Sequence, residues 1–144
     1  MTLVNQWGGK SFKKTCHRLF VLGDGMKKIK GGNEMVSVPS QGQIIWSTLD
    51  PIEGHEQRGH RPMLVVSNES FNRLCGGLVK IAPITTSTNE FPTHIPLPKG
   101  LAVEGKVMIQ HERTIDVIAR GYEIAGQVPK EYLDKIIHLI KATY

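Results

Sequence analysis

Short apolar runs separated by turn residues constrain the fold of this chain most strongly. Each run is rich in Ile, Val and other residues that favour strands, and turn-forming residues such as Gly, Pro and Asp follow it. We expect strands at residues 43–49, 62–67, 78–85, 93–97, 106–110 and 122–128. Residues 113–118 fit either an extended segment or a short helix, and Pro83 predicts an edge strand or a bulge in the third run.

The only long helical pattern covers residues 129–141. Pro129 stands in the first turn, where proline is tolerated, and apolar residues recur at three- and four-residue spacing along the segment. One or two helical turns are also expected at residues 69–74. Short strands with one amphipathic C-terminal helix predict a mainly β fold, a compact antiparallel barrel covered by that helix.

The distribution of charge divides the chain into two parts. Its 144 residues suffice for one domain, and the formal net charge is +5. Residues 1–34 hold seven Lys or Arg and two acidic residues, whereas the 11 Lys or Arg and 11 Asp or Glu of residues 35–144 cancel. Any contact of this second part with nucleic-acid phosphate must therefore come from a local cluster and not from a global basic field.

Residues 1–34 also differ from the rest in being rich in Gly and Lys, without sustained periodicity. They form either a basic arm for RNA or the ribosome, or a segment that is disordered or not natively translated. The second interpretation is favoured, because this composition poorly supports a packed element. If the gene is bacterial, codons for residues 30–32 can form a purine-rich ribosome-binding sequence, which would make Met35 the native start. We therefore expect the functional domain at residues 35–144.

The cysteines and the apolar segments bear on where the protein works. Cys16 and Cys75 have no CxxC spacing and are too few for a disulfide framework, which suits a reducing compartment. No run approaches the roughly 18 apolar residues of a membrane span. Residues 19–22 are too short for a secretion signal. We expect a cytoplasmic protein.

Charged and titratable side chains are concentrated in residues 50–61, between the first two expected strands. His55, Glu56, Arg58, His60 and Arg61 all fall in this stretch, which Gly54 and Gly59 interrupt. A loop between two well-formed strands is where a rigid scaffold usually presents its chemistry. This loop is therefore the first candidate for the functional site.

Four segments resemble the MazF/PemK/Kid family of toxin endoribonucleases. In chain order they are GQIIWSTLDPIEGHEQRGHRPMLVVSNESFN, IAPITT, ERTIDVIARG and the proline-led C-terminal helix. The resemblance covers residues 41–142 and is specific because order and spacing match together. It implies an SH3-like β-barrel homodimer that cuts single-stranded mRNA at short sequences without a metal or other cofactor. It also implies a MazE/PemI-like antitoxin as partner.

The resemblance also implies catalytic roles for Arg61, Glu56 and Thr85. Arg61 matches the arginine of the family's G-x-R-P pattern, and a guanidinium can hold a phosphate through two parallel N–H bonds. Glu56, followed by Gln57, matches a family motif whose carboxylate acts as base or orienting group. Thr85 matches a hydroxyl that contacts the scissile phosphate, with Thr86 as the fallback. Which residue is the general base stays open.

Candidate RNA-binding residues lie in the same segments. They are Gln57, His60, Thr86, Phe91 and His111. Phe91 stands in a polar loop where its ring could stack on a base, whereas Trp46 is expected in the core. Gln110-His111 replaces the acidic residue and Gln that related toxins often carry, a departure that can change base preference. The histidine spacing, without HxH or HxxxH, predicts no metal site.

Two further functions compete with the nuclease. One is a non-catalytic, CcdB-like inhibitor of DNA gyrase on the same fold, since fold alone does not set function. The other is an inactive regulator that binds nucleic acid, which the neutral charge of residues 35–144 disfavours. Glu56, Arg61 and Thr85 in matching positions favour the nuclease.

Overall fold

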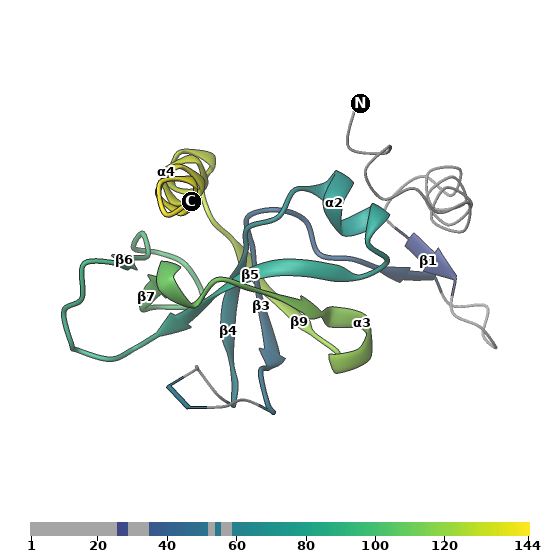
Figure 1. The fold of residues 1–144 in the computed structure, drawn as a ribbon, viewed down its shortest axis with the longest axis horizontal. Helices are drawn as coiled ribbons and strands as arrows, with labels where there is room; N and C mark the ends of the chain where they lie inside the picture. Colours follow the sequence, from purple (N-terminus) through teal and green to yellow (C-terminus); the bar gives the residue numbers. More distant parts are fainter. Residues whose placement is uncertain (1–25, 29–34, 52–53, 56–58) are drawn as a thin grey trace.

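The computed structural model describes residues 26–28, 35–51, 54–55 and 59–144 (Figure 1). A seven-stranded antiparallel sheet runs in the order β6-β7-β5-β4-β3-β9, and β8 pairs with β5 beside this path. Its strands are β3 (Gln43–Thr48), β4 (His60–Val65), β5 (Leu78–Thr85), β6 (His94–Pro96), β7 (Lys106–Met108), β8 (Arg113–Asp116) and β9 (Glu123–Gln127). The helices are α2 (Glu69–Leu74), α3 (Val117–Arg120) and α4 (Lys130–Lys141), with a 3₁₀ turn η2 (Ile109–His111).

The predicted mainly antiparallel fold with a C-terminal helix is confirmed. The sheet bends like a barrel but is not closed, because β6 and β9 form its two ends. The ambiguous residues 113–118 are part strand and part helix, since β8 ends at Asp116 and the Asp116 side chain caps α3. Among the described residues, no helix is both long and apolar enough to cross a membrane.

Two apolar clusters lie on opposite faces of the central strands, because neighbouring residues of a strand point to opposite faces. Ile44, Leu64 and Ile84 belong to the first cluster, which α4 covers with Leu133, Ile136 and Ile140. Ile45, Met63 and Ile81 belong to the second, with Ile115 of β8 and Val117 of α3. The amphipathic pattern of the C-terminal segment therefore has the role that the sequence predicts, as cover for one face of the sheet.

The prediction that Pro83 marks an edge strand or a bulge is wrong. β5 is an interior strand, and Pro83 is buried opposite Met63 of β4 in an unbroken register. On its other side β5 pairs with β8 up to Ile81 and with β7 only from Ile84. Pro83 therefore lies where β5 changes partner, and a missing N–H is tolerated there.

Most of the segment that precedes the expected domain boundary at residue 35 lies outside the described residues. Of residues 1–34 only Met26–Lys28 are described, and they form β1, which pairs with β2 (Met35–Ser37) in a separate two-stranded sheet. The interpretation of residues 1–34 as an extension stays a prediction.

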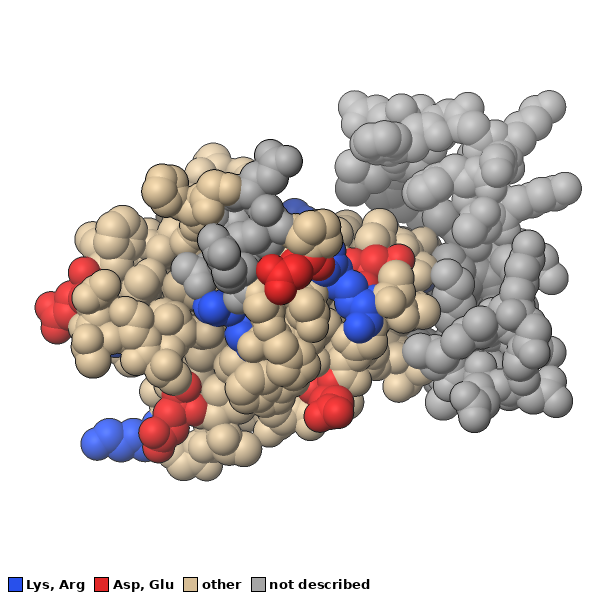
Figure 2. All heavy atoms as spheres, turned by 90° about the horizontal axis from the view of Figure 1, so that it is seen from below, with Lys and Arg blue, Asp and Glu red and all other residues tan. Residues whose placement is uncertain are grey.

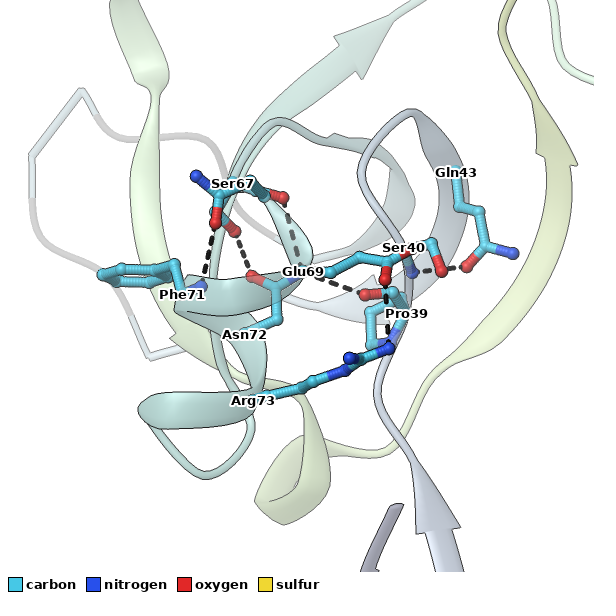
Figure 3. A network of polar contacts seen from close by, with 9 residues as sticks. Pro39, Ser40, Gln43, Ser67, Glu69, Phe71, Asn72 and Arg73 are labelled. Atoms are coloured by element: carbon cyan, nitrogen blue, oxygen red, sulfur yellow. Dashed lines mark hydrogen bonds and ion pairs between the residues drawn. The ribbon is translucent and has the colours of Figure 1, made fainter. Parts of the chain in front are cut away.

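A polar network around Asn72 joins α2 to the segment before β3 (Figure 3). The fully buried Asn72 amide donates to the carbonyls of Pro39, at 3.0 Å, and Ser67, at 3.3 Å. The Ser67 hydroxyl donates to the Asn72 side-chain oxygen and accepts from the Lys80 backbone N–H at 2.9 Å. The network thereby fixes the turn between β4 and β5, the two strands on which the candidate site depends.

We expect Asn72→Ala to lower the free energy of unfolding by about 2–3 kcal/mol, because it leaves buried polar partners without hydrogen bonds. The matched control is Arg73→Ala, one residue along, which removes only the exposed 3.1 Å ion pair with Glu69. That control should cost less than about 1 kcal/mol. Urea unfolding of both variants measures the difference, and equal losses of stability would contradict a structural role for the network.

Candidate active site

The pairing of β4 with β5 brings two of the predicted catalytic residues together. Met63 lies opposite Pro83, and Val65 lies opposite Ile81. Extending this register by two residues towards the strand ends puts Arg61 opposite Thr85. Opposite residues of an antiparallel pair share a face, with Cβ atoms about 4.5–5.5 Å apart. A guanidinium and a hydroxyl from separate sequence segments therefore project from the same end of the sheet.

Arg61 is half-buried at this strand end, opposite Ser47 of β3. Partial burial lowers the pKa of its guanidinium from the ordinary value, and the charge of Asp50 opposes that shift. An arginine keeps its positive charge at neutral pH under such a change. The site thus holds a permanent cation in a partly desolvated position, where its field acts more strongly on a bound anion.

Thr85 carries the second polar group of this strand end. Its hydroxyl oxygen accepts a hydrogen bond from the backbone N–H of Ser87 at 3.2 Å. This bond uses a lone pair of the oxygen and not the hydroxyl hydrogen, so the group can still donate to a ligand. The fallback residue, Thr86, is exposed and follows directly in the loop.

Two arginines hold the end of β3, where the charged loop begins. Arg120 donates to the carbonyls of Thr48, at 2.9 Å, and Asp50, at 2.6 Å. Arg113 donates to the intervening carbonyl of Leu49 at 2.6 Å. Three successive carbonyl oxygens are therefore bound by two cations from the ERTIDVIARG segment. The sequence alone indicates no role for these arginines, because nothing in the spacing shows which carbonyls they bind.

The two ends of the same loop are joined to each other. The Leu49 N–H donates to the Gly59 carbonyl at 3.1 Å, and the Gly59 N–H donates to the Asp50 carboxylate at 3.2 Å. Gly59 has φ +82°, a conformation that favours glycine over residues with a side chain. Predicted residues Glu56 and Gln57 lie outside the described residues, between these two fixed ends.

His60 is not brought to the face of Arg61. Neighbouring residues of a strand point to opposite faces, and the exposed His60 ring stacks on Trp46 with a centroid distance of 5.5 Å. Its Nδ1 also lies 3.4 Å from the Thr48 hydroxyl. Trp46 itself is half-buried, whereas the sequence suggests a core position.

The other predicted contacts lie along β6, β7 and the loop before them. Thr85 pairs with Lys106 of β7, whose ammonium donates to the Asn89 carbonyl at 3.4 Å. Phe91 is 55% exposed, and its ring lies 5.4 Å from that of His94. His111 is half-buried in η2. The sequence alone indicates no role for Lys106, which strand pairing places beside Thr85, or for His94, which a turn brings against Phe91.

Charges on the surface are few and mixed. On the face shown in Figure 2, Lys and Arg side chains form separate small groups among Asp and Glu, without a continuous basic field. Phosphate binding on this face then depends on individually placed cations. In the described part of the chain, no group of three or more His, Cys, Asp or Glu residues could hold a metal ion.

We expect Arg120→Ala to loosen the anchored loop without unfolding the protein. Losing the bonds to the Thr48 and Asp50 carbonyls should speed hydrogen exchange at the Leu49 and Gly59 amides about fivefold or more. Arg73→Ala is the matched control, because Arg73 is likewise exposed in the last turn of a short helix. NMR-detected exchange measures both, and unchanged rates in Arg120→Ala would show that the loop does not depend on this contact.

Comparisons with known proteins identify the family of this chain. A family model described as PemK-like, MazF-like toxin of type II toxin-antitoxin system matches residues 40–143. Endoribonuclease toxin MazF of Escherichia coli (strain K12) is 34% identical over 99 residues, which cover 69% of this chain and 87% of that protein.

Solved structures show the same relationship. The crystal structure of MazF (Form-I) from Deinococcus radiodurans matches with a TM-score of 0.70 and 31% identity, over 75% of this chain and 97% of that one. A MazE-MazF crystal structure (Form-II) from the same organism matches with a TM-score of 0.63 and 27% identity, over 75% and 96%. The family resemblance in the sequence is thus confirmed, and this chain belongs to the PemK-like, MazF-like toxins of type II toxin-antitoxin systems.

Proposed function

We propose that this chain is a sequence-specific endoribonuclease that cleaves single-stranded mRNA through attack of the ribose 2′-hydroxyl, without a metal, and so inhibits translation and growth. The carrying observation is the β4–β5 pairing, which includes Met63 opposite Pro83. The proposal continues this register by two residues, which sets Arg61 opposite Thr85. Curated relatives from Escherichia coli bear the name endoribonuclease, which supports RNA cleavage. No observation on the described residues favours gyrase inhibition.

Arg61 and Thr85 supply the stabilisation that this reaction needs. Attack of the 2′-oxygen on phosphorus places extra negative charge on the phosphate oxygens. The Arg61 guanidinium binds two of these oxygens through parallel N–H bonds and keeps its charge throughout. The Thr85 hydroxyl donates a hydrogen bond to the same group. Because Arg61 is already partly desolvated, this stabilisation exceeds that of a fully solvated arginine.

Proton transfers complete the reaction. A base takes the 2′-hydroxyl proton while the 2′-oxygen bonds to phosphorus, and an acid protonates the 5′-oxygen as its bond to phosphorus breaks. The products are a 2′,3′-cyclic phosphate and a 5′-hydroxyl. Glu56 is proposed as the base or as the group that orients it, in the loop whose ends Arg113, Arg120 and Gly59 hold.

RNA follows the surface from Arg61 and Thr85 across β7 and β6. The exposed Phe91 ring provides a surface on which a base stacks, and Thr86 and His111 are further contacts. Gln57 and His60 complete the proposed set, with His60 approaching from the other face of β4.

A MazE/PemI-like antitoxin is the proposed protein partner, and the protein acts as a homodimer in the cytoplasm. The structural relative from Deinococcus radiodurans was crystallised as MazE-MazF, which supports an antitoxin. Two cysteines without a disulfide pattern support a reducing compartment.

The central test is cleavage of mixed single-stranded RNA in EDTA, with the 5′ ends of the products mapped. The wild-type protein should make discrete cuts, and Arg61→Ala should lower the rate by at least roughly 100-fold, the usual loss when a group that stabilises transition-state charge is removed. The control Arg73→Ala should cut normally. If the wild-type protein leaves RNA intact and stalls DNA gyrase, the chain is a gyrase inhibitor and not a nuclease.

We expect Phe91→Ala to raise KM for an oligonucleotide about tenfold while kcat changes little, because base stacking on an aromatic ring contributes about 1–3 kcal/mol. Phe91→Trp keeps a ring and should keep KM near the wild-type value. Steady-state cleavage of a fluorescent oligonucleotide measures both constants. Equal KM values for Phe91→Ala and the wild type would exclude this ring from the RNA interface.

A further inference from the structure

We propose that Gln110 recognises one base of the RNA, through a side-chain amide that Thr93 and His94 hold in a fixed orientation. The inference rests on the proposed RNA cleavage and adds a specificity-determining residue to it. Its basis is a set of polar contacts at the ends of β6 and β7, beside the exposed ring of Phe91.

The Gln110 amide has a defined orientation. Its oxygen accepts a hydrogen bond from the Thr93 hydroxyl at 2.5 Å, and its nitrogen lies 2.8 Å from Nε2 of His94. An amide nitrogen only donates, so Nε2 of His94 is the acceptor in this contact. The carbonyl therefore points to Thr93 and the NH₂ group to His94, although Gln110 itself is exposed.

The His94 ring is itself restrained. One side lies against Phe91, and Nδ1 is buried without a hydrogen-bond partner among the described residues. A buried polar atom without a partner costs free energy, and the contacts with Gln110 and Phe91 hold the ring in this position. An exposed glutamine is normally free to rotate, and here two neighbours remove that freedom before any ligand binds.

The held amide keeps hydrogen-bonding capacity for a ligand. It has two N–H donors and two lone pairs on oxygen, and Thr93 and His94 use one of each. One donor and one acceptor remain. Adenine offers the complementary pair through its N6 amino group and N7, the pairing that glutamine makes with this base. A base with this pattern, stacked on or beside Phe91, is the ligand that fits.

The strand pairing places this group on the path of an RNA bound at the catalytic residues. Thr85 lies opposite Lys106 of β7, and His94 of β6 lies opposite Met108, two residues further along β7. Strand spacing and rise put His94 roughly 12 Å from Thr85. If an RNA chain is bound by its scissile phosphate at Arg61 and Thr85, a nucleotide next to that phosphate can reach Gln110 and His94.

The test compares cleavage of a random single-stranded RNA pool by the wild type and Gln110→Glu, with sequencing of the 5′ ends. Glutamate offers acceptors but no donor, so it disfavours the adenine pattern and favours bases that present donors, such as cytosine or guanine. We expect the preference to change about tenfold or more at one position of the cut site, and other positions to keep theirs. The control Gln127→Glu makes the same change on β9, at the opposite end of the sheet, and should leave every position unchanged.

Thr93→Val provides a second variant that leaves Gln110 in place. It removes the hydroxyl that fixes the amide, so the preference at the same position should relax without a new favoured base. Unchanged preferences in Gln110→Glu, or an equal loss of cleavage at all sequences, would overturn the inference, because a purely structural glutamine gives one of these results. Failure of the wild type to cut any RNA would instead contradict the proposed function.

Discussion

The antiparallel pairing of β4 with β5 is the constraint on which the rest of the site depends. Residues opposite each other share a face, and the observed pairs extend to Met63 opposite Pro83. Continuing this register by two residues sets Arg61 against Thr85 at the strand ends. A shift of one residue would turn Arg61 towards the other face of the sheet. The buried Asn72 network at the far turn and the apolar clusters on both faces protect this register.

A neutral surface makes the placement of each cation important. Residues 35–144 carry equal numbers of basic and acidic residues, so affinity for an RNA backbone cannot come from a diffuse field. Arg61 is the residue proposed to bind the phosphate, whereas Arg113 and Arg120 donate to backbone carbonyls at the end of β3. In this proposal, fixed geometry replaces net charge, and the held amide of Gln110 applies the same principle to base choice.

The sequence predicts much of this fold because its signals are local. Apolar runs and turn residues predict the strands of the main sheet to within a few residues, except β8, whose segment fitted either a strand or a helix. Residues 69–74 form the expected short helix. Pro83 was misjudged, because its tolerance depends on where β5 changes partner, a property of three strands together. Arg61 and Thr85 could be chosen by family resemblance, but their proximity follows only from strand register. The contact of Arg113 with the Leu49 carbonyl and the contact of Gln110 with His94 both link segments that no local sequence pattern connects.

The most direct test is a crystal structure of the protein bound to an RNA whose cleavage site carries a 2′-deoxyribose. Without its 2′-hydroxyl the substrate binds but cannot react. We expect the scissile phosphate within hydrogen-bonding distance, about 3 Å, of both the Arg61 guanidinium and the Thr85 hydroxyl. A phosphate bound away from this pair, with Arg61 turned to solvent, would contradict this expectation.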